Sequence, residues 1–498
     1  MSRLSRTLAL IAGVGLLAGI PTRADNKDDF FNSLDPEMKA FLDGADKEMD
    51  DFLKSANEEM VKMLGKPWEE FLNIPTPKPQ PDPEPEPVIL DDDIHTRPDP
   101  KPRPVIIETI VTPPAPKPAP TPVSPIKEIP APAPLPDVSF TYYGTPMKVR
   151  GVALNGFGIS GRRYADGWQK LMDLQLNNLV LDLLKLRDDY ALCDWAFMNV
   201  AQKAASKLTN GRPNETAMLT CFLLAQCGYQ MRLCEDSVNR LHTLFACNGI
   251  LYDSGYYNIK GQKYYPLTPP NGATYICDFA FPKEQVVDMG ITRNMKLAYA
   301  PGQTRTVTAK YVPDFTVTVT PNKNLIDFYN DYPASTLDDT PYTKWAVYAN
   351  VPVSPELKKG LYPKAKEVIA GKSQREAANA LLHMAQSFPY GYDEKIWGHD
   401  RAFFPDETWQ YPYSDCEDHA IHFSRMVRDL MGLDVVLVYY PGHLASAVAF
   451  TDPSITGDYI NYRGKKFTVC DPTIFYSNIG QTMTGMDNSK AILVDLKR

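Results

Sequence analysis

A cysteine, a histidine and an aspartate follow one another at compact spacing in the last quarter of this 498-residue chain. Cys416 begins a helical pattern, His443 opens an apolar strand pattern 27 residues later, and Asp471 ends another strand pattern 28 residues after that. A thiol, an imidazole and a carboxylate in this order can form an acyl-transfer site, because the imidazole takes the thiol proton and the carboxylate orients the ring. The sequence therefore predicts these three residues as catalytic.

The surroundings of Cys416 work both for and against a reactive thiol. The pattern predicts a helix that starts at Ser414 or Asp415, so unpaired backbone N–H groups of its first turn would lower the pKa of the thiol. Nearby carboxylates would oppose a thiolate unless they point at the helix N-terminus or at partner cations. These acidic neighbours are Asp415, Glu417 and Asp418.

The elements that must position the three residues form an α+β pattern. An amphipathic helix is predicted over 373–387, where Ser373 and Glu376 fit a capping box. A second helix is predicted from residue 415 to about Met431, with Gly432 as its stop. One long helix that leads into antiparallel strands favours an α+β core. The strands are predicted over 434–440, 444–450 and 466–470.

Four segments within residues 340–480 resemble the transglutaminase-like superfamily, and its exported bacterial members more than the animal cross-linking enzymes. They are 377–390, 415–418, 441–443 and 470–473. The resemblance implies a papain-like transglutaminase core, a helix plus an antiparallel sheet. Cys416 is then the nucleophile, His443 the general base and acid, and Asp471 the orienting carboxylate. It also implies an oxyanion donor shared between the nucleophile's own N–H and an upstream side chain, for which the candidates are Trp409, Gln410, Tyr411 and Tyr413. The Gly-Gln-Cys-Trp signature of the animal enzymes is absent, so calcium-dependent cross-linking is not implied.

Composition divides the whole chain into five parts. Residues 1–24 have a basic start and a short apolar run, which is typical of a secretory signal peptide. Residues 25–73 predict an acidic amphipathic helix with an eleven-residue repeat. Residues 74–137 hold 22 of the 45 prolines and predict an extended linker. Residues 138–330 predict a second α+β domain, and residues 331–498 form the catalytic domain.

Two questions about the N-terminal parts stay open in the sequence. The apolar stripe of the predicted helix, which includes Phe41, Phe52 and Met63, must be buried. It could self-associate or dock on a partner through residues 28–73, or pack on the protein's own globular part. In the linker, the apolar islands 88–90 and 105–107 could add strands to another surface, but a solvated tether is favoured.

Residues 190–275 repeat the catalytic layout weakly. The nucleophile position of this second region holds Asn214 or Glu215, His242 follows, and Thr268 falls near the aspartate position. We interpret the 138–330 domain as a degenerate transglutaminase-like copy that lost catalysis and binds or scaffolds.

Other cysteine and histidine patterns carry weaker predictions. His419 and His422 could hold a metal with Cys416, but no fourth ligand has suitable spacing, so core or surface histidines are favoured and neither metal nor cofactor is predicted. Five cysteines in one predicted helical region either pair or stay as buried thiols, and the sequence leaves both open. They are Cys193, Cys221, Cys227, Cys234 and Cys247.

Charge and hydropathy narrow the function. The net charge is −8, and residues 25–72 alone carry 14 acidic and 6 basic side chains, which also gives −8. A basic stripe is missing, so nucleic acid is an unfavoured partner. Past the signal, the sequence has no apolar stretch long enough to cross a membrane.

We therefore expect an exported protein, periplasmic or extracellular, that acts on a protein or peptide substrate. The predicted function is a thiol enzyme that forms an acyl-enzyme from an amide, as a peptidase or deamidase if water resolves it or a transamidase if an amine does. The alternative is a tethered envelope scaffold or binding protein that keeps the transglutaminase-like fold without catalysis.

Overall fold

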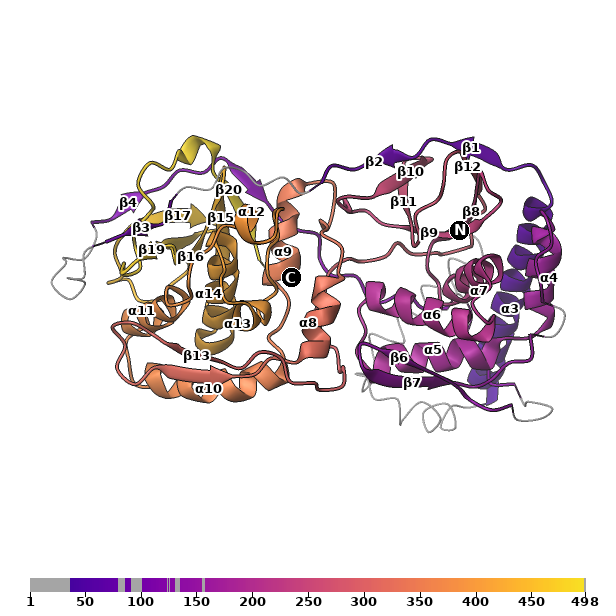
Figure 1. Cartoon of the computed structure of the whole chain (residues 1–498), viewed down its shortest axis with the longest axis horizontal. Coiled ribbons are helices and arrows are strands. Elements are labelled where there is room, and N and C mark those ends of the chain that lie inside the picture. The colour runs from indigo at the N-terminus through magenta and orange to yellow at the C-terminus, as the bar shows by residue number, and fades with distance from the viewer. Residues whose placement is uncertain are drawn as a thin grey trace. The chain divides into compact units, whose positions relative to one another are not determined.

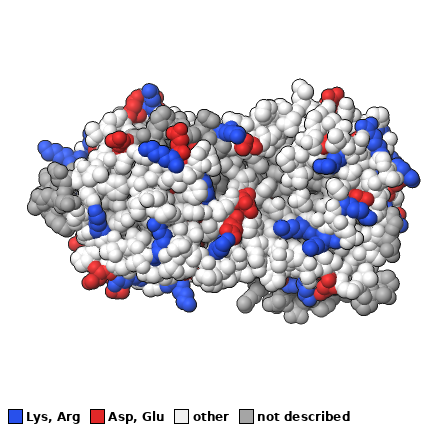
Figure 2. Space-filling view, in the orientation of Figure 1, with Lys and Arg blue, Asp and Glu red and all other residues white. Residues whose placement is uncertain are grey.

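The computed structural model describes residues 36–78, 86–90, 101–122, 124, 126–129, 135–154 and 157–496. The predicted signal, residues 1–24, lies outside the described residues. The chain forms two compact units, residues 1–57 and 58–498. Among the described residues, no helix is both long enough and apolar enough to span a membrane. Basic and acidic side chains are interspersed on the face shown in Figure 2.

The predicted N-terminal helix is shorter than the sequence suggests. Helix α3 covers Pro36–Leu64. Within the second unit, Met60 and Leu64 of its apolar stripe are buried while Glu59 is exposed, as the repeat requires. The chain then turns into short strands, so the prediction of helix through residue 73 is wrong at this end. These strands are β1 (Glu69–Phe71) and β2 (Ile74–Pro75).

Four helices and a seven-stranded sheet follow the hairpin of β6 (Val138–Tyr142) and β7 (Thr145–Val149). This first sheet has the order β1-β12-β8-β9-β11-β10-β2, and α7 packs against β8 and β9. The helices are α4 (Tyr164–Asp173), α5 (Asn177–Asp189), α6 (Asp194–Leu208) and α7 (Pro213–Gln226). The strands are β8 (Met231–Asp236), β9 (Leu241–Ala246), β10 (Gly255–Ile259), β11 (Gln262–Pro266) and β12 (Thr274–Cys277).

The sequence predicted one helical region that holds the five cysteines up to Cys247, and this prediction is wrong beyond α7. Every residue of β8 and β9 is buried, so these strands show no polar alternation and resemble a buried helix in sequence. None of the eight cysteines forms a disulfide, and all but Cys193 are buried. The interpretation of the five cysteines as buried thiols therefore holds for all of them except Cys193.

The second sheet has the order β4-β17-β18-β16-β15-β20-β5 (Figure 1). Three of its strands agree with the predicted ones to within two residues at each end, and they are β15 (Val435–Tyr440), β16 (His443–Val448) and β18 (Lys465–Cys470). The sheet also contains β17 (Asp458–Tyr462) and β20 (Ile492–Asp495), besides the two edge strands β4 and β5. The short strand β19 (Ile474–Phe475) lies outside this sheet.

Helix α14 (Cys416–Met431) lies against β15 and β16 and is covered by α10 and α11. Phe423, Met426 and Val427 of this helix share one core with Val448 and Cys470 of the sheet. The capping box predicted for the preceding helix is confirmed, since Ser373 and Glu376 cap α11 reciprocally. The neighbouring elements are β13 (Arg305–Thr308), β14 (Thr316–Val319), α8 (Lys323–Asn330), α9 (Lys344–Ala349), α10 (Pro355–Ile369), α11 (Gln374–Ala385), α12 (Asp393–Ile396) and α13 (Glu407–Gln410).

The described residues of the proline-rich segment are not the solvated tether that was favoured. Strands β1 and β2 form both edges of the first sheet, and β4 (Arg103–Pro104) and β5 (Thr109–Val111) form both edges of the second. Strand β3 (Val88–Ile89) pairs with β19. The apolar islands therefore lie on the sheets, with Val105 3% exposed in the core of the second sheet. We call the described residues of 69–129 the strap.

Proline explains why the sequence prediction missed these strands. Proline lacks the N–H that an interior strand must donate, but an edge strand needs to bond on one side only. Pro75 and Pro104 each lie in a two-residue edge strand, and the residues after them donate instead. Thr76 N donates to Ser254 O at 2.9 Å, and Val105 N donates to Tyr459 O at 2.7 Å.

Candidate active site

Cys416 is the first residue of α14, as predicted, and Asp415 is the N-cap. Asp415 and Asp418 form a reciprocal capping box, in which Asp415 N donates to Asp418 Oδ2 at 3.2 Å. Two of the three acidic neighbours thus point at the helix N-terminus, although burial raises the pKa of Asp418 well above its usual range. Gly432 adopts the left-handed conformation at the C-cap and ends the helix as predicted.

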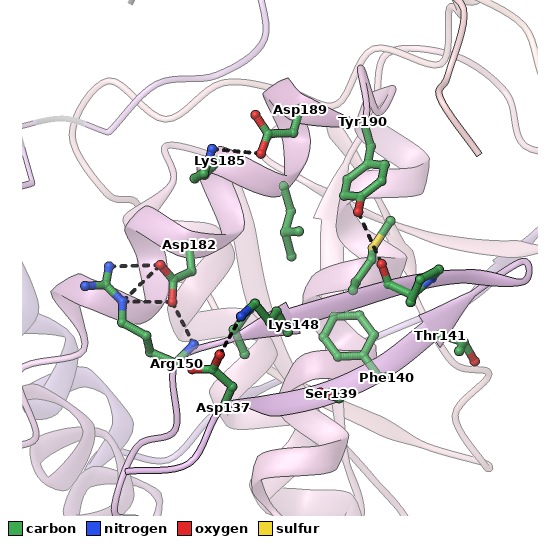
Figure 3. Close-up of a pocket in the computed structure, with 14 residues that line it drawn as sticks. Asp137, Ser139, Phe140, Thr141, Lys148, Arg150, Asp182, Lys185, Asp189 and Tyr190 are labelled. Carbon is green, nitrogen blue, oxygen red and sulfur yellow. Dashed lines mark hydrogen bonds and ion pairs between the residues drawn. The ribbon is translucent and has the colours of Figure 1, made fainter. Parts of the chain in front are cut away.

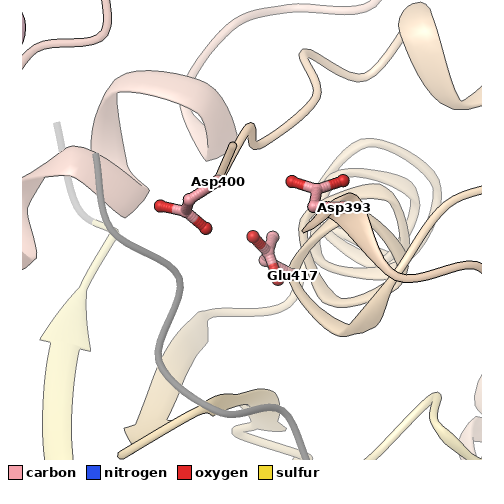
Figure 4. A group of neighbouring side chains, drawn as sticks. All are labelled: Asp393, Asp400 and Glu417. Carbon is pink, nitrogen blue, oxygen red and sulfur yellow. The ribbon is translucent and has the colours of Figure 1, made fainter. Parts of the chain in front are cut away.

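Glu417, the third acidic neighbour, points into a carboxylate cluster (Figure 4). Its carboxylate and those of Asp393 and Asp400 offer oxygens within 4.8 Å of one another. Burial and then the charge of Asp400 raise the pKa of Glu417, while the cation of Lys344 opposes this shift. Lys344 Nζ lies 3.0 Å from Asp400 Oδ2 and is the partner cation of the cluster.

This cluster is the group of described side chains with the geometry to hold a metal ion, since carboxylate oxygens are ligands for hard cations. Lys344 already neutralises one of its three charges. The alternative metal set of Cys416, His419 and His422 does not converge among the described residues. Nε2 of His419 lies 2.8 Å from Ser414 Oγ instead.

His443 and Asp471 are brought into direct contact. His443 is the first residue of β16 and Asp471 follows the last residue of β18, and the two strands are paired. His443 Nε2 donates to Asp471 Oδ2 at 2.8 Å, and the other carboxylate oxygen accepts from the N–H and hydroxyl of Thr473 at 3.0 and 2.7 Å. The carboxylate is therefore fixed on both oxygens and fixes the imidazole in turn.

The other ring nitrogen of His443, Nδ1, takes no part in the bond to Asp471. His443 Nδ1 is buried and has no hydrogen-bond partner among the described residues. With a proton on Nε2 held by Asp471, Nδ1 carries the lone pair that can accept a proton from a thiol. A buried polar atom left unpaired in a folded protein calls for a functional explanation.

The thiol lies on the helix that packs on the strand of the imidazole, but the thiol–imidazole hydrogen bond is not formed in this structure. Cys416 Sγ donates to Glu417 Oε2 at 3.2 Å. Cys416, His443 and Asp471 are each 2% exposed, so the three groups are closed off from solvent. Thiol–base contacts are often loose before substrate binds and tighten later.

The structure narrows the set of oxyanion donors. The Gln410 side-chain oxygen accepts from Gln303 N at 2.9 Å, and the Tyr411 hydroxyl bonds to Asn330. Tyr413 is 48% exposed. Trp409 is fully buried and its Nε1–H has no partner among the described residues. Because Gln303 engages only the oxygen of Gln410, the Gln410 amide N–H group and the Trp409 Nε1–H are the two candidate donors, and the Trp409 ring lies against Phe388 in the core.

Sequence reasoning missed the residues that join the thiol turn to the aspartate loop. His419 bonds to Ser414, two residues before the thiol, and its ring packs edge-on against Phe475, four residues after Asp471. Burial lowers the pKa of His419 to about 4, so it is neutral at physiological pH. The available signal was its position one helical turn after Cys416, on the same face.

The first sheet carries a matching but different arrangement at the predicted copy. Asn214 is the second residue of α7, and its side chain bonds to Leu241 N and Asn239 O at 2.9 and 3.1 Å. His242 lies 2.9 Å from Thr268 Oγ1 through Nδ1 and 3.1 Å from Asp236 Oδ2 through Nε2. Both ring nitrogens are thus bonded.

A cavity of about 730 Å³ lies elsewhere, between the β6–β7 hairpin and α5 (Figure 3). Its charged side chains pair with one another, as in Arg150 with Asp182 and Lys148 with Asp137. No family model, curated protein or solved structure matched this chain, so the likeness to transglutaminases depends on the motifs quoted above.

Proposed function

We propose that the protein is an exported thiol enzyme that cleaves or transfers amide bonds through Cys416, His443 and Asp471. The observation that carries the proposal is the His443–Asp471 pair, which leaves a buried Nδ1 lone pair without a partner among the residues that the structure describes. A cysteine at the first turn of the helix packed on the same strand supplies the nucleophile. The expected substrate is a protein or peptide.

The proposed reaction has two steps. In the first, His443 Nδ1 takes the proton of Cys416, Sγ attacks the amide carbon, and the C–N bond breaks as the imidazolium returns the proton to the leaving amine. In the second, water or an amine gives a proton to the same nitrogen and attacks the thioester, and the C–S bond breaks as the imidazolium returns that proton to Sγ of Cys416. Water gives hydrolysis and an amine gives transamidation.

Cys416 must first leave its bond to Glu417 in this reaction. Burial raises the pKa of Glu417, which favours its neutral form and so lessens its repulsion of a thiolate. The backbone N–H groups of the first turn of α14 then stabilise the sulfur anion, since the capping box satisfies only part of that turn.

Alkylation of Cys416 by iodoacetamide at pH 7 tests the proposal, with peptide mapping to separate the eight cysteines. A thiol near its ordinary pKa is only a few per cent ionised at this pH, so loss of the base in His443→Ala should slow the reaction roughly thirtyfold. His242→Ala is the matched control in the first sheet and should leave the rate unchanged. Equal, slow alkylation of all three proteins would favour the scaffold.

An activated ester separates the two enzymatic outcomes without knowledge of the natural substrate. p-Nitrophenyl acetate should release nitrophenolate in a burst and leave one acetyl group on Cys416. Added primary amine should then have one of two results. It either accelerates the loss of the acetyl group from Cys416 and is itself converted to the acetyl amide, or it leaves the rate of that loss unchanged. The first result identifies a transamidase and the second a hydrolase.

A further inference from the structure

The strap occupies every edge of both large sheets. Strands β1 and β2 pair with β12 and β10 of the first sheet, and β4 and β5 pair with β17 and β20 of the second. Exposed sheet edges bind other extended chains, so proteins usually cover them. Figure 1 shows the purple strands β3 and β4 beside the yellow end of the chain.

One strap strand lies next to the candidate site. Strand β3 runs parallel to β19, with Val88 opposite Ile474 and Ile89 opposite Phe475. Strand β19 starts three residues after Asp471, and Thr473 between them bonds to the Asp471 carboxylate. On the thiol side, the Phe475 ring packs on His419, which bonds to Ser414.

Strand β3 is also held on β19 more weakly than β4, another strap strand, is held on β17 of the second sheet. Leu90 N donates to Phe475 O at 3.2 Å, and Ile89 is 70% exposed. By contrast, the Arg103 guanidinium bonds to both oxygens of Asp458 at 2.9 and 2.6 Å, and Val105 is buried. A local opening can therefore release β3 while β4 stays attached.

We propose that β3 holds the place of the substrate and shields the site, and that an extended polypeptide binds β19 in its stead. This inference rests on the proposed thiol chemistry and adds a substrate class and a control to it. An extended chain that pairs with β19 gains backbone hydrogen bonds and presents alternate side chains to the protein. Val88 and Leu90 are half-buried while Ile89 points outward, so the favoured substrate carries apolar residues at two positions separated by one.

Removing the Leu90 N–H tests this inference on the full-length protein. Leu90→Pro deletes the donor to Phe475 O, and Leu90→Val, whose side chain has as many carbons as that of proline, keeps the donor. The loss of one backbone hydrogen bond should raise the open population, and with it the rate of Cys416 alkylation, roughly fivefold in Leu90→Pro relative to Leu90→Val. Cys470, the last residue of β18 in the second sheet, is fully buried, so its alkylation reports global unfolding.

The outcomes separate this inference from the proposed function. Faster alkylation of Cys416 with Cys470 still protected supports the shield, and unchanged alkylation in Leu90→Pro overturns it. If both cysteines become reactive, hydrogen exchange of the Leu90 N–H in the unmutated protein decides. Exchange faster there than in β16 supports local release of β3, and equal exchange overturns it. If His443→Ala slows the alkylation of Cys416 but Leu90→Pro does not accelerate it, the proposed enzyme stands and the shield is rejected. If Leu90→Pro accelerates the alkylation but His443→Ala does not slow it, only the proposed enzyme is rejected.

Discussion

The two large sheets of this protein have the same topology around different chemistry. Reading from β12 in one and β20 in the other, the orders β12-β8-β9-β11-β10 and β20-β15-β16-β18-β17 correspond strand for strand in chain order. A helix, α7 or α14, precedes each set and packs on its first two strands. A histidine lies at the start of the second strand in each, His242 in β9 and His443 in β16.

The two sheets differ in the hydrogen bonds that their histidines make. In the first sheet, Asp236 and Thr268 bond to the two ring nitrogens of His242, and Asn214 stands near the helix start in place of a thiol. In the second sheet, Asp471 bonds to one nitrogen of His443, and the other has no partner in the part of the chain that the structure describes. The same framework therefore supports a fully satisfied structural histidine or one with a proton-accepting site to spare. This contrast supports the interpretation of the first region as a degenerate copy.

The glycines that follow the two core helices provide the largest expected contrast in stability. Gly228 after α7 and Gly432 after α14 both have positive φ, +93° and +66°. A Cβ at 432 meets nothing nearby, so Gly432→Ala should cost only about 1 kcal/mol of backbone strain. A Cβ at 228 collides with the carbonyl of Thr121 in the strap, so Gly228→Ala should cost about 3 kcal/mol. Urea unfolding of both variants measures this, and equal losses would mean that the strap does not press on α7.

Buried aspartates should give the two sheets opposite responses to pH. Burial alone would raise the pKa of Asp236, but bonds from Arg240 N, His242 and Asn271 hold it at about 2. Its contribution to stability is present above the unfolded value near 4 and is lost as pH falls towards 2. Asp236→Asn should therefore destabilise the protein by about 2 kcal/mol at pH 7 and have little effect near pH 2.

Asp406 beside α13 is the matched control with the opposite sign. Burial raises its pKa to about 6, in spite of a bond from Ser354 N. The protonated form is favoured in the folded state, so this contribution is present below pH 4 and is lost as pH rises through 6. Asp406→Asn should flatten the fall in stability between pH 4 and 6, as measured by urea unfolding across this range. A flat profile for the unmutated protein would contradict the assignment.

The carboxylate that orients His443 should matter for reactivity and its counterpart in the first sheet should not. Asp471→Asn keeps the size of the side chain, but its amide group can donate to Nε2 and so place the proton on Nδ1, where no thiol proton can then be accepted. Alkylation of Cys416 at pH 7 should fall roughly tenfold, which is about 1.4 kcal/mol. Thr268→Val removes the hydroxyl that bonds to His242 and should leave that rate unchanged. A similar loss in both variants would point to a general loosening of the fold.

Local signals in the sequence predicted the second sheet well. The start of α14 at Asp415, its stop at Gly432 and the capping box of α11 were predictable because capping depends on a few adjacent residues. The strands β15 and β16 were predictable because turn residues, such as those at 441–442, bound them. The sequence therefore also predicted that Cys416 starts α14 and that His443 starts β16.

Non-local features were beyond sequence reasoning. The burial of β8 and β9 on both faces removed the alternation that identifies strands, and the strap strands depend on partners more than 150 residues away in sequence, as for Ile74 with Tyr256. The bond from Cys416 to Glu417 and the lone Nδ1 of His443 depend on side-chain placement alone. No spacing rule could have distinguished His443 from His242 before their partners were known.

A cysteine placed in the first sheet should show no activation, which is the smallest expected effect and the most direct test of the contrast. In Asn214→Cys, the introduced thiol would lie at the first turn of α7, but both nitrogens of His242 are already bonded to Asp236 and Thr268. Its alkylation rate should match that of an ordinary thiol of equal exposure and should be the same in Asn214→Cys combined with His242→Ala. If His242→Ala slowed the alkylation of that thiol, then His242 would be able to exchange a partner for a proton. The distinction between the two sheets would then lie in the missing sulfur alone and not in the imidazole.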